Sequence, residues 1–244
     1  MTRAAIIQSS YVPWRGYFDF IRSAEIFVYY DDVQYSTGSW RNRNRLKAKA
    51  GPRWLTVPVH ASVSNAIDET AIARSNGDWR TKHRRQIEQA LAPAKFFDDA
   101  IRVWHTGVAG DLASISELNI RLTHAINEYL GIATRTVKSR DFQLAGSGTT
   151  RLIDLLRKLR ADVYLSGPTA KGYIDEDQFR AAGIQLEYKS YDYAPYPQLW
   201  GAFEGAVTVL DLIANTGRDA FRHLASRSPN LVAVPSPRAS ESAA

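Results

Sequence analysis

Short apolar runs alternate with polar loops at the N-terminal end of the chain. Residues 4–8 form a short, mainly apolar run, residues 16–23 follow a helical pattern, and residues 26–30 are β-branched and aromatic. This order predicts a strand, a loop, a helix and a second strand. In a βαβ unit with parallel strands, the loop that leaves the first strand opens at the carboxyl edge of the sheet, where α/β proteins usually bind ligands. We therefore expect the loop at residues 9–14 to border a ligand site.

Helical periodicity dominates the middle of the chain, and strands and helices alternate again in its second half. A polar excursion at 36–51 and a strand at 54–59 precede predicted helices at 78–91, 95–104 and 111–129. The later alternation predicts strands at 134–139, 163–166 and 184–188 and helices at 149–160, 175–182 and 206–215. The sequence therefore predicts an α/β fold, with a Rossmann-like sheet, flanking helices and an inserted or following helical layer.

The length and the composition bound the number of domains. The chain has 244 residues, 45% of them hydrophobic, so we expect one α/β domain over residues 1–227. Residues 228–244 are rich in Ser, Pro and Ala and cannot bury enough apolar surface to offset the entropy of ordering, which predicts a disordered tail. No apolar run approaches the ~20 residues that span a bilayer, and no signal peptide is evident. We expect a cytoplasmic protein without a membrane span.

Composition also limits the chemistry. The chain has no cysteine, which excludes disulfides, thiol nucleophiles and cysteine-bound metal centres. The sequence has no HExxH motif, EF-hand loop or GxSxG elbow, so we predict neither a metal site nor a Ser-His-Asp triad. The formal net charge of +6 favours anionic partners such as nucleotide sugars, phosphates or RNA.

Motifs in colinear order carry a family resemblance. They are QSSYVPWRGYF at 8–18, YDDVQY at 30–35, WRNRN at 40–44, WLTVP at 54–58, the spacing of Trp79, Lys82 and His83, YLSGPTAKGYI at 164–174 and LDLIANTG at 210–217. Together they resemble the WbqC-like protein family over about residues 4–225.

This resemblance implies a function in the biosynthesis of O-antigen and other surface polysaccharides. The implied reaction is the attachment of an amino acid, glycine being the usual suggestion, or of an acyl group to an amino sugar. The implied cofactor is an activated acyl or aminoacyl donor. The implied partners are a nucleotide sugar or other small anionic substrate, and aminoacyl-tRNA as one source of the donor.

Two other functions stay open. The layout of strand, Pro13-Trp14-x-Gly16-Tyr17, helix and strand is similar to the PxHxGH opening of nucleotidyl-transferring Rossmann-like enzymes, which suggests an ATP-dependent ligase or nucleotidyltransferase. Both histidine positions of that motif are aromatic here, however, and Trp14 cannot carry a proton or a charge to phosphate. The aromatic residues are also consistent with a non-catalytic carbohydrate-binding or assembly protein.

Three residues are candidates for acid–base catalysis. Asp31 and Asp32 directly follow the second predicted strand, and neighbouring residues of an extended chain point to opposite faces, so we expect one of them to face the site. His83 shares a helix face with Trp79, and an imidazole is suited to remove a proton from an attacking amine. The alternatives are a turn-forming pair or a helix-cap acceptor for the carboxylates, and a structural role for the histidine.

The candidate substrate-binding residues are more numerous. Arg41, Asn42 and Arg43, followed by Arg45, form an alternating basic set that would grip phosphate if the segment is extended, or else a solvated basic loop. The other candidates come from the same motifs: Gln8, Tyr11, Trp14, Tyr17, Gln34, Lys82, Lys171 and Tyr173. We expect most of the aromatic residues of the first forty to pack in the core, and Gln8 and Tyr11 to be the better candidates for ligand contact. A mechanism requires these groups to converge on one cleft at a single edge of the sheet.

Overall fold

A six-stranded sheet organises the computed structural model, which describes residues 1–62, 64–73 and 78–236. The sheet order is β5-β2-β1-β6-β7-β8, and every pair is parallel except the antiparallel pair β7–β8. The strands are β1 Arg3–Ile7, β2 Ile26–Tyr29, β5 Arg135–Lys138, β6 Val163–Ser166, β7 Gln185–Tyr188 and β8 Leu231–Val234. The chain moves outward from β1 to β2 and β5 and then returns to β6 beside β1. This reversal creates a topological switch point, at which open α/β sheets bind ligands.

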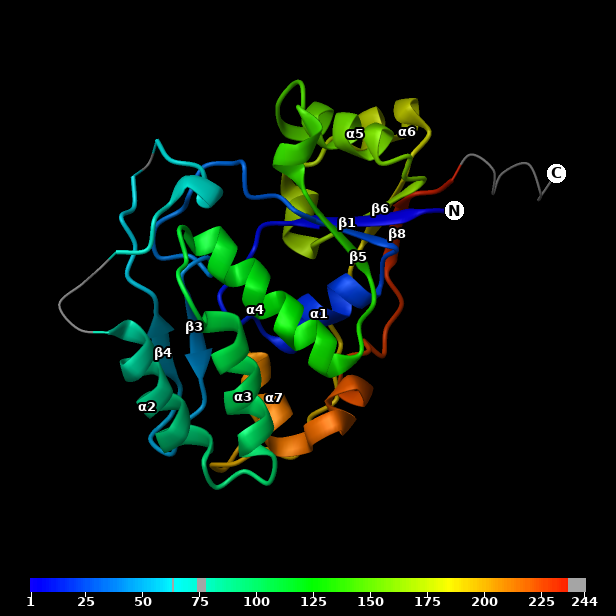
Figure 1. Ribbon diagram of the computed structural model, residues 1–244. Coiled ribbons are helices and arrows are strands. Elements are labelled where there is room, and N and C mark those ends of the chain that lie inside the picture. The colour runs from blue at the N-terminus through cyan, green and yellow to red at the C-terminus, as the bar shows by residue number, and fades with distance from the viewer. Residues whose placement is uncertain (63, 74–77, 237–244) are drawn as a thin grey trace.

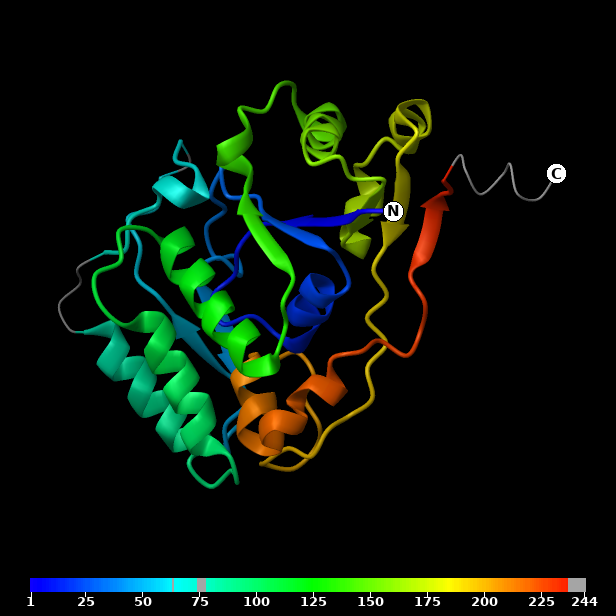
Figure 2. The same cartoon turned by 45° about the vertical axis from the view of Figure 1, so that its right-hand side comes forward.

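Helices cover both faces of the sheet (Figures 1 and 2). Alternate residues of a strand point to opposite faces, so Ala5 and Phe27 pack toward helix α1, Arg15–Arg22, whereas Ile6 and Val28 pack toward helices α5, Gly148–Lys158, and α6, Glu176–Ala182. The central strands β1, β2 and β6 can be buried on both faces because their sequences are mainly apolar runs rather than alternating patterns. The predicted Rossmann-like α/β arrangement is therefore confirmed.

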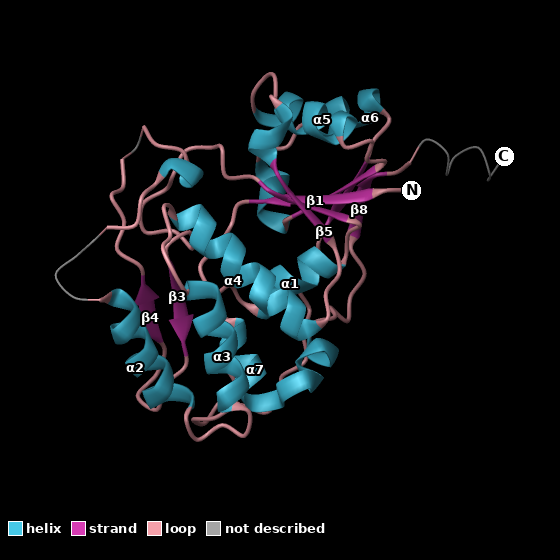
Figure 3. Ribbon diagram, viewed as in Figure 1, coloured by secondary structure: helices cyan, strands magenta, loops and turns pink. Residues whose placement is uncertain are grey.

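A helical layer continues the core on the α1 side of the sheet (Figure 3). Its helices are α2 Trp79–Leu91, α3 Phe97–Val108, α4 Ile115–Leu130 and α7 Val209–Thr216. Gly107 allows α3 and α4 to pack closely, since a Cβ there would lie 2.5 Å from Cδ2 of Leu122. The described ranges also contain short 3-10 helices: η1 Ile67–Glu69, η2 Ser139–Phe142, η3 Pro168–Gly172 and η4 Gly217–His223. None of the helices in the described ranges is long and apolar enough to cross a membrane.

Two segments differ from the sequence expectation. The polar excursion at 36–51 contains strand β3, Arg43–Leu46, which forms an antiparallel pair with β4, Arg53–Thr56. The expected disordered tail at 228–244 is wrong for its first part, because Leu231–Val234 form β8 along the outer edge of β7. A short strand gains order when its backbone pairs with a sheet edge, even where its composition favours disorder. The rest of the tail, at 237–244, lies outside the described residues.

Candidate functional site

Two adjoining cavities open near the carboxyl end of β1. The larger cavity has a volume of about 560 Å³ and lies at the switch point, between the ends of β1 and β6 and the N-terminus of α5. The smaller cavity has a volume of about 320 Å³ and is bordered by Pro13, Trp14, Tyr17 and Trp40. Ile7 and Arg41 line both cavities. Volumes in this range are typical of small-molecule sites.

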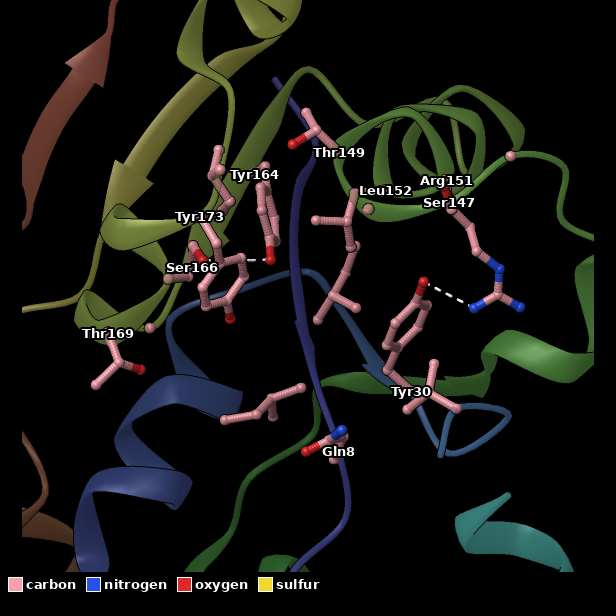
Figure 4. Close-up of a pocket in the computed structure, with 18 of the residues that line it drawn as sticks. Gln8, Tyr30, Ser147, Thr149, Arg151, Leu152, Tyr164, Ser166, Thr169 and Tyr173 are labelled. Atoms are coloured by element: carbon pink, nitrogen blue, oxygen red, sulfur yellow. Dashed lines mark hydrogen bonds between the residues drawn. The ribbon is translucent and has the colours of Figure 1, made fainter. Parts of the chain in front are cut away.

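Polar side chains from several elements surround the larger cavity (Figure 4). Gln8 follows β1, Ser166 ends β6, and Thr169 and Tyr173 come from the segment around η3. Figure 4 shows the Tyr164 ring between this segment and α5, with its hydroxyl 3.3 Å from the Ser166 hydroxyl. The cavity thus offers hydroxyl and amide groups for hydrogen bonding around an apolar floor formed by the strand ends.

The N-terminal turn of α5 forms one wall of the larger cavity. Gly146 and Gly148 have positive φ values of 79° and 50°, and both line the cavity together with Ser147 and Thr149. Ser147 is the N-cap residue, but its side chain accepts no capping hydrogen bond. The first N–H groups of a helix have no partner within the helix and carry its positive dipole end, so this turn favours an anion.

No functional role was predicted for the segment at 146–151 from the sequence, although a signal was present. Gly-Ser-Gly-Thr precedes a helix with a clear apolar stripe, which is a helix start signature, and the expected helix at 149–160 agrees with α5. That signature identifies a helix end and does not show what it faces. Only the sheet order places this turn beside the end of β1.

Asp32 is held by an ion pair at the rim of the larger cavity. Its carboxylate accepts from Nη2 of Arg151 at 2.7 Å and from the Ser139 hydroxyl. Arg151 also donates to the Tyr30 hydroxyl at 2.7 Å, as the dashed line in Figure 4 marks. Arg151 and Tyr30 both line the cavity, whereas Asp32 is not among the lining residues. The pair therefore joins the loop after β2 to α5.

Asp31 points away from Asp32, as expected for neighbouring residues of an extended chain. Its carboxylate is buried and accepts from the Ser9 backbone N–H at 2.8 Å and from the Ser116 hydroxyl. Burial raises the pKa of Asp31, and the bonds from Ser116 and Ser9 oppose that shift. Neither aspartate is among the residues that line the two cavities. Asp31 instead fixes the loop after β1 against α4.

The arginines after Trp40 do not form one phosphate clamp. Arg41 is buried between the two cavities, whereas the Arg43 guanidinium lies over the Trp54 ring, 4.3 Å from its centre. Arg45 donates to the backbone carbonyl of Ala206 at 3.1 Å. Asn42 is also occupied, because its side chain donates to the carbonyl of Val57 at 2.9 Å. Of this predicted set, Arg41 alone lines these two cavities.

His83 lies in a buried aromatic cluster instead of a cavity wall. Its Nδ1 atom is 2.8 Å from the Tyr11 hydroxyl, and its Nε2 atom is 3.2 Å from the carbonyl of Thr56. Trp79 packs edge-on against its ring. Burial lowers the pKa of His83 to about 4, the Thr56 contact opposing that change. This placement does not support a general base that reaches substrate, and Tyr11 is equally enclosed.

The remaining predicted residues fall into two groups. Gln8 and Tyr173 line the larger cavity, and Trp14 and Tyr17 line the smaller one. The others are exposed and are not among the residues that border these cavities: Gln34, Lys82 and Lys171. The structure therefore brings together part of the predicted set, around the end of β1, and leaves the rest elsewhere.

Comparison with known proteins identifies the family. The sequence model of the WbqC-like protein family matches residues 8–223. The chain belongs to the WbqC-like protein family. It is similar to the uncharacterized protein Rv1507c of Mycobacterium tuberculosis, with 43% identity over 229 residues that cover 92% of this chain and 98% of that protein. No solved structure matches the chain.

The opening motif of this WbqC-like chain has a clear structural basis. Its Pro13, Trp14 and Tyr17 wall the smaller cavity, and the Trp14 ring lies directly over Gly16. A Cβ at Gly16 would lie 2.3 Å from Cζ2 of Trp14, so a larger residue would displace the ring. The spacing of Trp14 and Gly16 thus determines the shape of the cavity. Trp14 and Tyr17 thus form an aromatic pocket wall at the two motif positions that are histidines in the PxHxGH opening of nucleotidyl-transferring enzymes.

Proposed function

We propose that this WbqC-like protein is a transferase of surface-polysaccharide biosynthesis. It attaches an acyl or aminoacyl group, with glycine as the first candidate, to the amino group of a nucleotide-linked amino sugar. The observation that carries the proposal is the pair of adjoining cavities that share Ile7 and Arg41. Two joined compartments of different character suit a substrate with an anionic part and a ring or acyl part.

The larger cavity suits the nucleotide. It combines the N-terminal turn of α5, the Arg151 and Tyr30 side chains and the small residues around Gly167, so a diphosphate can approach backbone N–H groups. The smaller cavity, with Trp14 and Trp40, suits a sugar ring, because an aromatic face stacks on the apolar face of a pyranose. The reacting amine then lies where the two cavities meet.

The reaction forms a C–N bond between the amine and the activated carbonyl and breaks the bond from that carbonyl to the thiolate or tRNA oxygen of the donor. The amine proton passes to a base or to the leaving group. None of the three predicted acid–base residues lines either cavity, and Asp32 is the candidate we retain because it is bonded to a lining residue, Arg151. Gln8 supplies an amide at the end of β1, close to the shared residue Ile7.

A mass measurement tests this proposal. The purified protein is incubated with nucleotide-linked amino sugars together with acyl coenzyme A donors or aminoacyl-tRNA, and a gain of one glycyl or acyl unit on the sugar is expected. Gln8→Ala should lower kcat/KM by about tenfold or more through the loss of a substrate contact. Gln89→Ala, at an exposed position of α2, is the matched control and should leave the rate unchanged. No mass gain with any donor would reject the transferase.

A second candidate function is ATP-dependent ligation or nucleotidyl transfer. The switch point between β1 and β6 favours it, since nucleotides bind at this place in many open α/β sheets. Trp14 and Tyr17 lie in the smaller cavity and provide no charge for a triphosphate. Release of pyrophosphate on mixing the protein with ATP and an amino acid would favour this candidate over the transferase, which releases none.

A further inference from the structure

Arg41 is a buried cation without an ion-pair partner. Its side chain is 9% exposed, and across residues 1–62, 64–73 and 78–236 no carboxylate lies within ion-pair distance of it. Its Nη1 atom is buried and has no hydrogen-bond partner in the same ranges. Asp31 is near enough to act on it electrostatically, but that carboxylate already accepts from Ser9 and Ser116. Burying a guanidinium without a hydrogen-bonded counter-charge costs free energy.

Arg41 is placed where it can contact an anion bound in the cavities. It lines the larger and the smaller cavity, so an anion in either compartment can reach it. The N-terminal turn of α5, an 11-residue helix, also lines the larger cavity, and Gly146 and Gly148 leave its backbone open to a ligand. Two independent features, a cation without a partner and a helix N-terminus, thus border one space.

We propose that Arg41 and the first turn of α5 together bind the diphosphate of the substrate. A diphosphate fits better than a single carboxylate because its charge is spread over two groups that can meet the two features at once. With Arg41 at the junction, the group beyond the diphosphate points into the aromatic smaller cavity. The assignment rests on the proposed function only in naming a nucleotide-linked sugar as the natural source of the diphosphate.

Binding of simple diphosphates tests the assignment without any knowledge of the sugar. Titration calorimetry with inorganic pyrophosphate, UDP and ADP should show binding to the wild-type protein. Arg41→Gln should raise each Kd by about tenfold or more, and Arg41→Lys should restore part of the affinity, since a point charge replaces a bidentate donor. Arg43→Gln is the matched control, because Arg43 packs on Trp54 and should leave each Kd within about twofold.

A second variant protects the test against loss of folding. Ser147→Asp places a carboxylate at the N-cap of α5, which favours the helix but repels an anion from the cavity. It should weaken pyrophosphate binding by about tenfold while the thermal midpoint stays at or above that of the wild type. Ser114→Asp is the control at the N-cap of α4, where Ser114 already accepts from Glu117, and it should bind pyrophosphate as the wild type does.

The outcomes separate this site from the transferase proposal. Unchanged pyrophosphate affinity in either Arg41→Gln or Ser147→Asp, or no diphosphate binding by the wild type, would overturn the site whatever the enzyme catalyses. Diphosphate binding without any mass gain on a sugar would keep the site and reject the transferase. Tighter binding of UDP than ADP indicates a nucleotide-linked sugar as the source, and the reverse order indicates ATP or a coenzyme A donor; either order supports the diphosphate site.

Discussion

The Tyr11 hydroxyl donates its proton to Nδ1 of His83 across 2.8 Å in the buried core. The direction follows from the neighbours. Trp104 can only donate, and its Nε1 lies 3.1 Å from the Tyr11 oxygen, so that oxygen accepts from Trp104 and gives its own proton to His83. The carbonyl of Thr56 can only accept, so Nε2 of His83 carries the proton. With a neutral imidazole every donor in this network, including the buried Tyr11 hydroxyl, has an acceptor.

This arrangement predicts a pH-dependent stability. The unfolded chain protonates His83 near its ordinary pKa of 6.5, whereas the folded protein does so only near 4. The folded-state pKa is lowered, so the unfolded state binds more protons at intermediate pH. The free energy of unfolding should be highest above about pH 6.5 and fall by up to roughly 3 kcal/mol as the pH drops toward 4.

Urea denaturation at several pH values measures this effect. His83→Gln should lose the part of the pH dependence between 6.5 and 4 and be less stable at pH 8. His105→Gln, an exposed histidine of α3, is the control and should keep the wild-type profile. Equal pH profiles for His83→Gln and the wild type would contradict the neutral buried histidine. Folded His83→Gln should also keep its diphosphate affinity, since His83 is not a lining residue of either cavity.

Gly16→Ala should disturb the smaller cavity. The added Cβ would lie 2.3 Å from the Trp14 ring, which has to move, and this overpacking should cost about 1–3 kcal/mol. Trp14 lines the cavity, so sugar binding should weaken along with stability. Gly172→Ala is the control, because nothing lies within 4 Å of the added Cβ. Denaturation curves and glycan titrations that are the same for both variants would argue against the role assigned to Gly16.

The pairing of β8 with β7 can be tested at one buried and one exposed position of the strand, which lie on either side of a register shift. Val234 is 2% exposed and pairs with Leu186, whereas Val232 is 49% exposed. Val234→Asp buries an unpaired carboxylate and should cost about 3 kcal/mol or more, while Val232→Asp should cost well under 1 kcal/mol. Thermal midpoints measure the difference. Similar midpoints for the two variants would show that β8 does not pair as described.

The main sheet and its helices were predictable because their signals are local. Ala4 to Ile7 and the run from Ile26 are apolar over the length of a strand, and the stripe around Leu118 and Leu122 has the helical period. The strands β3, β4 and β8 carry weaker signals, since β3 and β4 order each other as an antiparallel pair and β8 is ordered by pairing with β7. The predicted strand at 54–59 agrees with β4 only over its first residues.

The site was less predictable because its contacts join distant parts of the chain. His83 was a good candidate by residue type. Its buried hydrogen bond to Tyr11, 72 residues away in the sequence, shows that it belongs to the core, and the sequence gives no sign of that contact. Arg41 and Arg43 look alike in the sequence, and only their neighbours separate a cavity-lining cation from one that packs on Trp54. The turn at 146–149 was visible as a helix start, but its position beside Gln8 depends on the return of the chain to the centre of the sheet.

Variants of the ion pair between Asp32 and Arg151 distinguish effects on diphosphate binding from effects on catalysis. The two side chains are 12% and 17% exposed, and a double-mutant cycle with Asp32→Asn and Arg151→Gln should give a coupling energy of about 1–3 kcal/mol in urea denaturation. Asp32→Asn also removes the counter-charge of Arg151, whose side chain lines the larger cavity. The affinity for pyrophosphate should therefore be kept or increased. Arg151→Gln should decrease it by about threefold or more, because a cation is lost from the wall.

The same variants test Asp32 as the base. If Asp32 removes the amine proton, Asp32→Asn should reduce the mass-gain rate by about a hundredfold or more while diphosphate binding persists. The loss should be recovered in part at higher pH, where more of the substrate amine is already deprotonated, and that pH profile is not expected from a merely structural defect. A normal rate in Asp32→Asn would leave its bond to Arg151 as the whole role of Asp32, namely to hold α5 beside the end of β1.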